Sequence, residues 1–219
     1  MNWKQCAGTM LVIAALRISA HSQLAAPTAI SDAGFSACSH NTCTFVPESE
    51  KPTVYRRGNL SYTVRVPARD EGGTFVMRRG RKVLLTTPLK DLSASVSVVW
   101  SQKSDWFAVT WSDGGAIGNF HTRIFHVVDE AVQEFPTVRN AFRSFRSRHW
   151  CRVRGDNVQA YRWDESGAIV LVMSVYPTGD CGEEAGHMEA YFVRPTDGIV
   201  LRRLTAARLD AYIKTHPVW

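Results

Sequence analysis

Short apolar segments separated by polar turns make up most of the chain after residue 52. Residues 60–66 (LSYTVRV) alternate between apolar and polar side chains, which is typical of a strand with one buried face. Similar segments recur at short intervals. We predict strands at 60–66, 74–77, 82–87, 96–100, 106–111, 121–128, 157–163, 169–176, 189–194 and 199–204. Many short strands with few helices indicate a mainly β fold with antiparallel sheets.

Two segments show helical periodicity instead. Between residues 137 and 146, apolar residues recur at i, i+3, i+4 and i+7 and define one helical face: Val138, Ala141, Phe142 and Phe145. Near the C-terminus, Thr205 is suited to cap a helix that ends before Pro217. We expect this second helix to turn three residues inward: Leu209, Tyr212 and Ile213.

Residues 1–22 have the pattern of a secretory signal peptide. Lys4 gives a positive start, residues 7–16 form an apolar run, and Ala20 and Ser22 fit the small positions before a cleavage site. The apolar run is too short for a membrane-spanning helix, which needs about 20 residues. We therefore expect export to a bacterial periplasm or beyond, with no transmembrane span in the mature chain.

The cysteine count supports export. The chain has 5 cysteines, and signal cleavage would remove Cys6 and leave an even number. An even number of cysteines in an exported protein indicates disulfides. Of the three possible pairings, we favour Cys38–Cys43, which closes a small loop, together with Cys151–Cys181, which joins two distant segments.

The rest of the chain divides into a leader and one domain. Residues 23–52 are rich in small and polar side chains and are expected to form a flexible leader with a small disulfide loop. Residues 53–219 are expected to form a single β-rich domain.

The alternative to disulfides is a metal site with thiolate and imidazole ligands from Cys38, His40, Cys43 and His187.

Two segments of the chain, residues 96–130 and 158–201, contain similar elements in the same order. Each has a strand that ends in Trp, a polar turn, a second strand and a third strand led by His. These units resemble the WD-repeat-like β-propeller blades of periplasmic Tol-system proteins. The resemblance covers residues 96–130 and 158–201. It implies antiparallel blade-like sheets, in a partial propeller or a sandwich-like arrangement with one or two short helices, and a protein-binding role.

The formal net charge of +6 is concentrated in two blocks, at residues 56–82 and 135–155. The candidate binding residues in these blocks are Arg139, Arg143, Arg146 and Arg148, together with Arg78, Arg79 and Arg81. Guanidinium groups bind phosphate and carboxylate in bidentate fashion. The blocks therefore predict a surface for an anionic envelope polymer, such as lipopolysaccharide or peptidoglycan, or for an acidic protein partner. The alternative is a solvated face on an arginine-rich chain.

Two further features suggest possible chemistry. Trp106 can stack on a sugar ring, although a core position is the more common role of Trp in small β proteins. His187 directly follows the acidic, glycine-rich loop 178–186, and His121 occupies the matching position in the other repeat unit. Together with Asp180 of the loop, the two histidines can form an acid–base site. A repeat position more often has a structural role.

No nucleophile elbow, zinc-protease motif or phosphate-binding loop occurs in the sequence. We therefore expect a non-enzymatic binding or interaction module of the bacterial envelope, with an arginine-rich anion-binding surface. We expect no cofactor, no metal and no nucleic-acid partner. The alternative is an envelope hydrolase, or an inhibitor of one, that uses the loop 178–187.

Overall fold

The computed structural model describes residues 28–29, 36–39, 41–45, 54–66, 72–114, 119–149, 151, 157–176 and 179–217. The expected signal peptide, residues 1–22, lies outside these ranges. Among the described residues, no helix has the length and apolar character required to cross a membrane.

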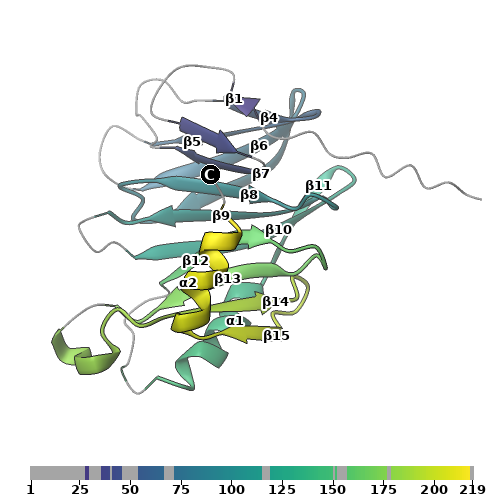
Figure 1. Cartoon of the computed structure of the whole chain (residues 1–219). Coiled ribbons are helices and arrows are strands. Elements are labelled where there is room, and N and C mark those ends of the chain that lie inside the picture. The colour runs from purple at the N-terminus through teal and green to yellow at the C-terminus, as the bar shows by residue number, and fades with distance from the viewer. Residues whose placement is uncertain are drawn as a thin grey trace, which may run out of the picture.

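Three antiparallel sheets and two helices form the described part of the chain, which confirms the mainly β, antiparallel fold (Figure 1). Sheet A has the strand order β1-β4-β5-β6-β7, sheet B has β11-β10-β9-β8-β3-β2, and sheet C has β12-β13-β14-β15. The strands of sheet A are β1 (Thr28–Ala29), β4 (Val54–Arg57), β5 (Leu60–Arg65), β6 (Gly73–Arg79) and β7 (Lys82–Leu89). Those of sheet B are β2 (Ser36–Ser39), β3 (Thr42–Phe45), β8 (Val96–Trp100), β9 (Trp106–Ser112), β10 (Phe120–Val128) and β11 (Ala131–Phe135). Those of sheet C are β12 (Val158–Trp163), β13 (Ile169–Ser174), β14 (Met188–Val193) and β15 (Val200–Leu204).

Each sheet contains four consecutive strands that pair in chain order: β4–β7, β8–β11 and β12–β15. The second and third of these units are the two stretches whose similarity is visible in the sequence. In both, the first strand ends at the shared tryptophan, Trp100 in β8 and Trp163 in β12. The unit β4–β7 has the same up-and-down order without the Trp-ended first strand, and so the sequence pattern does not reveal it.

Sheet B lies between the other two sheets, and its central strands β8 and β9 are buried on both faces. One face contributes Trp100, Phe107 and Phe125 to a core shared with sheet A. The opposite face contributes Val99, Ala108 and Ile124 to a core shared with sheet C. Every residue of β8 is therefore buried, which explains its nearly continuous apolar sequence.

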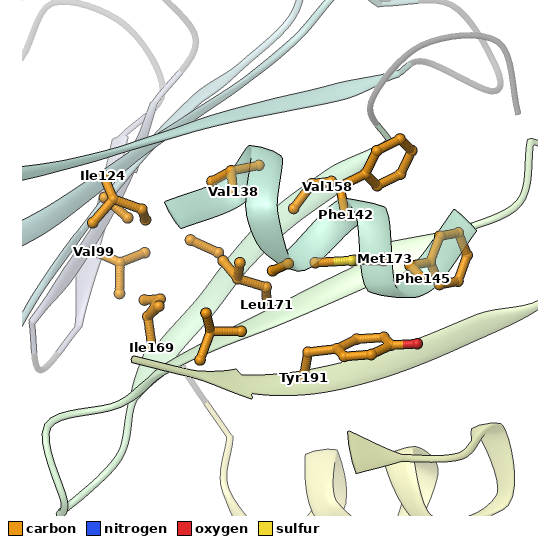
Figure 2. Close-up of a cluster of buried hydrophobic side chains, with 14 of the residues drawn as sticks. Val99, Ile124, Val138, Phe142, Phe145, Val158, Ile169, Leu171, Met173 and Tyr191 are labelled. Atoms are coloured by element: carbon orange, nitrogen blue, oxygen red, sulfur yellow. The ribbon is translucent and has the colours of Figure 1, made fainter. Parts of the chain in front are cut away.

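The helix α1 (Thr137–Arg146) begins and ends where the periodicity predicts. Its apolar face packs into the core between sheets B and C. Figure 2 shows Phe142 and Phe145 on this face beside Met173 and Tyr191 of sheet C. The rings of Phe145 and Tyr191 meet edge to face, with their centroids 6.2 Å apart.

The turn between β14 and β15 also holds α1. Gly198 has a φ of +75°, and a Cβ there would lie 2.5 Å from the carbonyl oxygen of Thr137. Only glycine permits this close approach of turn and helix. The Nδ2 group of Asn140 donates to the carbonyl oxygen of Asp197 at 2.7 Å. The helix is thus fixed by backbone contacts as well as by its apolar side chains.

The helix α2 (Ala206–Thr215) covers the outer face of sheet C. Leu209 is fully buried and Tyr212 packs against the same cluster, as expected. The expectation for Ile213 is wrong, since its side chain is exposed. Ile213 lies one turn beyond Leu209 on the same side of α2, and it lines a partly open pocket together with Tyr161 and Val172 of sheet C. Thr205 occupies the N-cap position but its side chain makes no capping hydrogen bond.

Part of the expected leader belongs to the sheets. Strands β2 and β3 form a hairpin whose second strand pairs with β8. Cys38 and Cys43 face each other across this hairpin and their sulfur atoms are 2.10 Å apart. Cys43 is completely buried. The disulfide therefore joins β2 to β3, and this pair of strands extends sheet B.

A buried arginine connects sheets A and B. The guanidinium of Arg57 in β4 lies 4.5 Å from the ring centroid of Trp100 and donates to the carbonyl oxygen of Ser101 at 2.6 Å. Burial lowers its pKa to about 10, although the nearby charge of Asp105 acts in the opposite direction. Its Nε and Nη1 atoms are buried without a hydrogen-bond partner among the described residues.

We expect the packing of the Arg57 side chain to matter more than its charge. Arg57→Ala removes the contact with Trp100 and opens a cavity, and should lower the free energy of unfolding by about 2–4 kcal/mol. Arg57→Met keeps apolar contact and removes a poorly paired buried charge, and should lose less than half as much. Urea unfolding followed by tryptophan fluorescence measures both. Equal losses in the two variants would contradict this account.

Candidate functional site

Three segments meet at the C-terminal end of α1. The first segment follows α1 and contains His149. The second is the 3₁₀ segment η1 (Gly179–Glu184), and the third is the beginning of β14. The disulfide Cys151–Cys181 joins the first two segments, with its sulfur atoms 1.93 Å apart. Both expected cysteine pairings are therefore present, and cysteines bonded in this way do not supply the thiolate ligands of the alternative metal site.

Glu184 organises the segment that follows α1. Its Oε2 atom accepts a hydrogen bond from the backbone N–H of Cys151 at 2.9 Å. Its Oε1 atom lies 3.4 Å from Nδ1 of His149. The His149 side chain is only 7% exposed, and its ring packs against Phe145 with the centroids 4.4 Å apart. The carboxylate thus sets the orientation of the His149 ring.

Glu189 in β14 is a nearly buried carboxylate with several partners. Nε2 of His187 lies 3.5 Å from its Oε1, and Nη1 of Arg203 lies 3.6 Å from the same atom. The Tyr191 hydroxyl donates to Oε2. Burial alone would raise the pKa of Glu189, but the Tyr191 hydrogen bond, Arg203 and His187 outweigh burial and lower it. Burial and the neighbouring carboxylate raise the pKa of Tyr191 to about 12.

These contacts place three potential ligand groups together. One nitrogen of His149, one nitrogen of His187 and one oxygen of Glu189 all lie within 4.8 Å of one another. The rings of His149 and His187 have their centroids 4.9 Å apart. Two imidazoles and a carboxylate form a donor set that suits transition-metal ions.

The arginines of α1 lie next to this cluster. Arg139, Arg143 and Arg146 are exposed and make no ion pair with any residue that the structure describes. Arg148, also exposed, donates to the Tyr191 hydroxyl at 3.1 Å. We call Arg139, Arg143 and Arg146 of α1, together with Arg148 just after the helix, the α1 arginine row. Opposite the row, the apolar face of the same helix is buried.

The second basic block has a different environment. In the β6–β7 hairpin, Arg79 donates to the carbonyl oxygen of Asp129, and Lys82 forms an ion pair with Glu130. Both acceptors lie in the turn between β10 and β11. Arg78 is partly exposed and Arg81 lies exposed at the hairpin tip. Figure 1 shows α1 at the far end of the stack from this hairpin, so the two basic blocks form separate surfaces.

Trp106 occupies a packed position. Its ring stacks on His126 with the centroids 4.4 Å apart and meets Phe135 at 4.6 Å. It packs against the core between sheets B and C and remains half-buried. These contacts are those of a core residue, the more common role of Trp in small β proteins.

The two histidines at matching repeat positions do not share a site. His121 lies in β10 of sheet B, where its ring faces Trp111 with the centroids 5.4 Å apart. The described partners of His187 are Glu189 and His149. The Asp180 side chain lies outside the described side chains.

His149 and Glu189 are absent from the sequence-based candidates, and Glu184 enters them only as a member of the loop 178–187. They come from segments far apart in the chain, and no compact motif contains all of them. The sequence contains one indication of the cluster. His187 and Glu189 are two residues apart at the start of a predicted strand, and side chains two residues apart in a strand lie on the same face. His149 and Glu184 also lie close to the two cysteines of one disulfide.

Comparison with known proteins yields no matching family model, curated protein or solved structure.

We expect the Cys151–Cys181 bond to contribute more stability than the Cys38–Cys43 bond. The first closes a loop across 30 residues and the second across 5. In the loop-entropy model these correspond to roughly 3–4 and 2 kcal/mol. Urea unfolding of the double variants Cys151→Ser with Cys181→Ser, and Cys38→Ser with Cys43→Ser, measures the two losses. An equal or smaller loss for the Cys151 pair would count against this expectation.

Proposed function

We propose that this chain is an exported, non-enzymatic binding protein of the bacterial envelope. It binds an anionic envelope polymer through the α1 arginine row. The observation that carries the proposal is the exposure of these arginines without an ion pair among the described residues, in contrast to Arg79 and Lys82.

The spacing of the row suits a polymer. Arg139, Arg143 and Arg146 follow at i, i+4 and i+7 on one face of the helix. Because an α-helix rises about 1.5 Å per residue, they span about 10 Å along its axis. A guanidinium group binds phosphate or carboxylate with two parallel hydrogen bonds. Repeated anionic groups along a polymer can therefore engage several arginines at once, which strengthens binding by effective concentration.

The support beneath the row is rigid. Phe145 and Ala141 are fully buried on the opposite face, and Asn140 is hydrogen-bonded to the β14–β15 turn. The helix backbone therefore needs no ordering when a ligand binds, and only the arginine side chains lose freedom. Arg143 and Arg146 lie in the last turn, where they also offset the partial negative charge of the helix C-terminus.

The disulfides support export. Both cysteine pairs lie at bonding distance, and such bonds persist in oxidising compartments such as the periplasm. The signal-like pattern of residues 1–22 agrees with this compartment.

The row can be tested with paired charge deletions. The variant Arg143→Ala with Arg146→Ala should reduce co-sedimentation with lipopolysaccharide vesicles or peptidoglycan sacculi about tenfold, the equivalent of roughly 1.4 kcal/mol. Added salt should weaken retention of the wild type, because exposed charges are screened.

The matched control is Arg208→Ala with Lys214→Ala, which removes two exposed charges from α2 instead. It should retain most of the binding. Unchanged retention in the α1 variant, or equal losses in both variants, would refute the α1 arginine row as the binding surface.

A further inference from the structure

We propose that His149, His187 and Glu189 form a binding site for a divalent transition-metal ion of the zinc type. This inference is independent of the proposed polymer binding. The three residues come from two segments that the Cys151–Cys181 disulfide links, and their ligand atoms lie within 4.8 Å of one another.

The spacing of the donors is close to that of a metal site. Nε2 of His187 and Oε1 of Glu189 are 3.5 Å apart. Two ligands of a tetrahedral zinc ion with bonds near 2.1 Å are about 3.4 Å apart. The remaining ligand is His149, and a shift of its ring by roughly 1 Å toward the other two brings all three within bonding range of one ion.

The environment of His149 is that of a metal ligand with a supporting carboxylate. Glu184 faces Nδ1, so Nε2 is the atom that points away from Glu184. That Nε2 is buried and has no hydrogen-bond partner among the residues that the structure describes. Buried polar atoms are normally satisfied, and an unsatisfied one calls for an explanation. A carboxylate on one nitrogen with a metal on the other is the common arrangement of metal-bound histidine.

Glu189 directs one carboxylate oxygen toward His187. Tyr191 donates to Oε2, which leaves Oε1 on the side of His187. Arg203 lies 3.6 Å from Oε1, where its charge balances the carboxylate and competes with a cation. Since the Arg203 side chain is 37% exposed, it can move into solvent when an ion binds.

The donor set selects among metals. Two imidazole nitrogens favour zinc and neighbouring transition metals over magnesium and calcium, which prefer oxygen ligands. Three protein ligands leave a fourth position for water or another small ligand. The His187 side chain is 35% exposed, so one side of the cluster is accessible to solvent.

The direct test is a zinc titration of the oxidised mature chain, purified without a histidine tag and freed of metal with a chelator. Isothermal calorimetry should show one zinc ion per chain. His187→Ala should weaken binding by more than tenfold, and Glu184→Gln by about 10- to 100-fold. His121→Ala is the matched control and should bind like the wild type, because His121 contacts Trp111 away from the cluster.

A second variant separates a built site from adventitious surface binding. Arg203→Gln removes a competing positive charge and should strengthen zinc binding severalfold. Circular dichroism checks that each variant folds. The partly exposed His187 is substituted in preference to the buried His149, because removing a buried side chain can itself disrupt folding. Absence of a saturable site in the wild type, or equal affinity of wild type and His187→Ala, would overturn the proposal.

Discussion

The burial of the central strands of sheet B on both faces is the constraint on which the rest of the structure depends. Strands β8 and β9 have no solvent face, so their side chains must match sheet A on one side and sheet C with α1 on the other. Neither outer sheet can cover its own apolar face without this central layer. The three four-stranded units therefore form a continuous stack, in which a change in one core is transmitted to the next through tightly packed side chains.

The position of α1 follows from this stack. Its apolar face fills the space between sheets B and C, which fixes the axis of the helix and leaves the arginines on the outside. The same packing fixes where the helix ends. Because Phe145 is fully buried beside Tyr191, the following residues emerge next to β14, and His149 reaches Glu189 and His187. The arginine row and the histidine–carboxylate cluster are thus two results of one helix placement.

Local sequence pattern was enough to predict most strands and both helices, because alternation and helical periodicity report directly on burial. The strands β1, β2, β3, β4 and β11 were not predicted. All of them have five residues or fewer, and in β11 no residue is fully buried. The exposure of Ile213 depends on how far sheet C covers α2, which periodicity does not determine. The cluster was harder still, since His149 and Glu189 are brought together by the packing of α1 on sheet C and by the Cys151–Cys181 disulfide, neither of which is visible in a local sequence pattern.

The Cys151–Cys181 bond encloses the strands β12 and β13 within a covalent ring. His149 lies two residues before this ring and Glu184 three residues after it. Even in the unfolded oxidised chain, the two residues stay near each other at an effective concentration on the order of millimolar. In the reduced chain they are separated by a long flexible segment, and their encounter must wait for the sheet to form. The redox state of one cystine therefore controls whether the pairing of His149 with Glu184 can precede folding or must follow it.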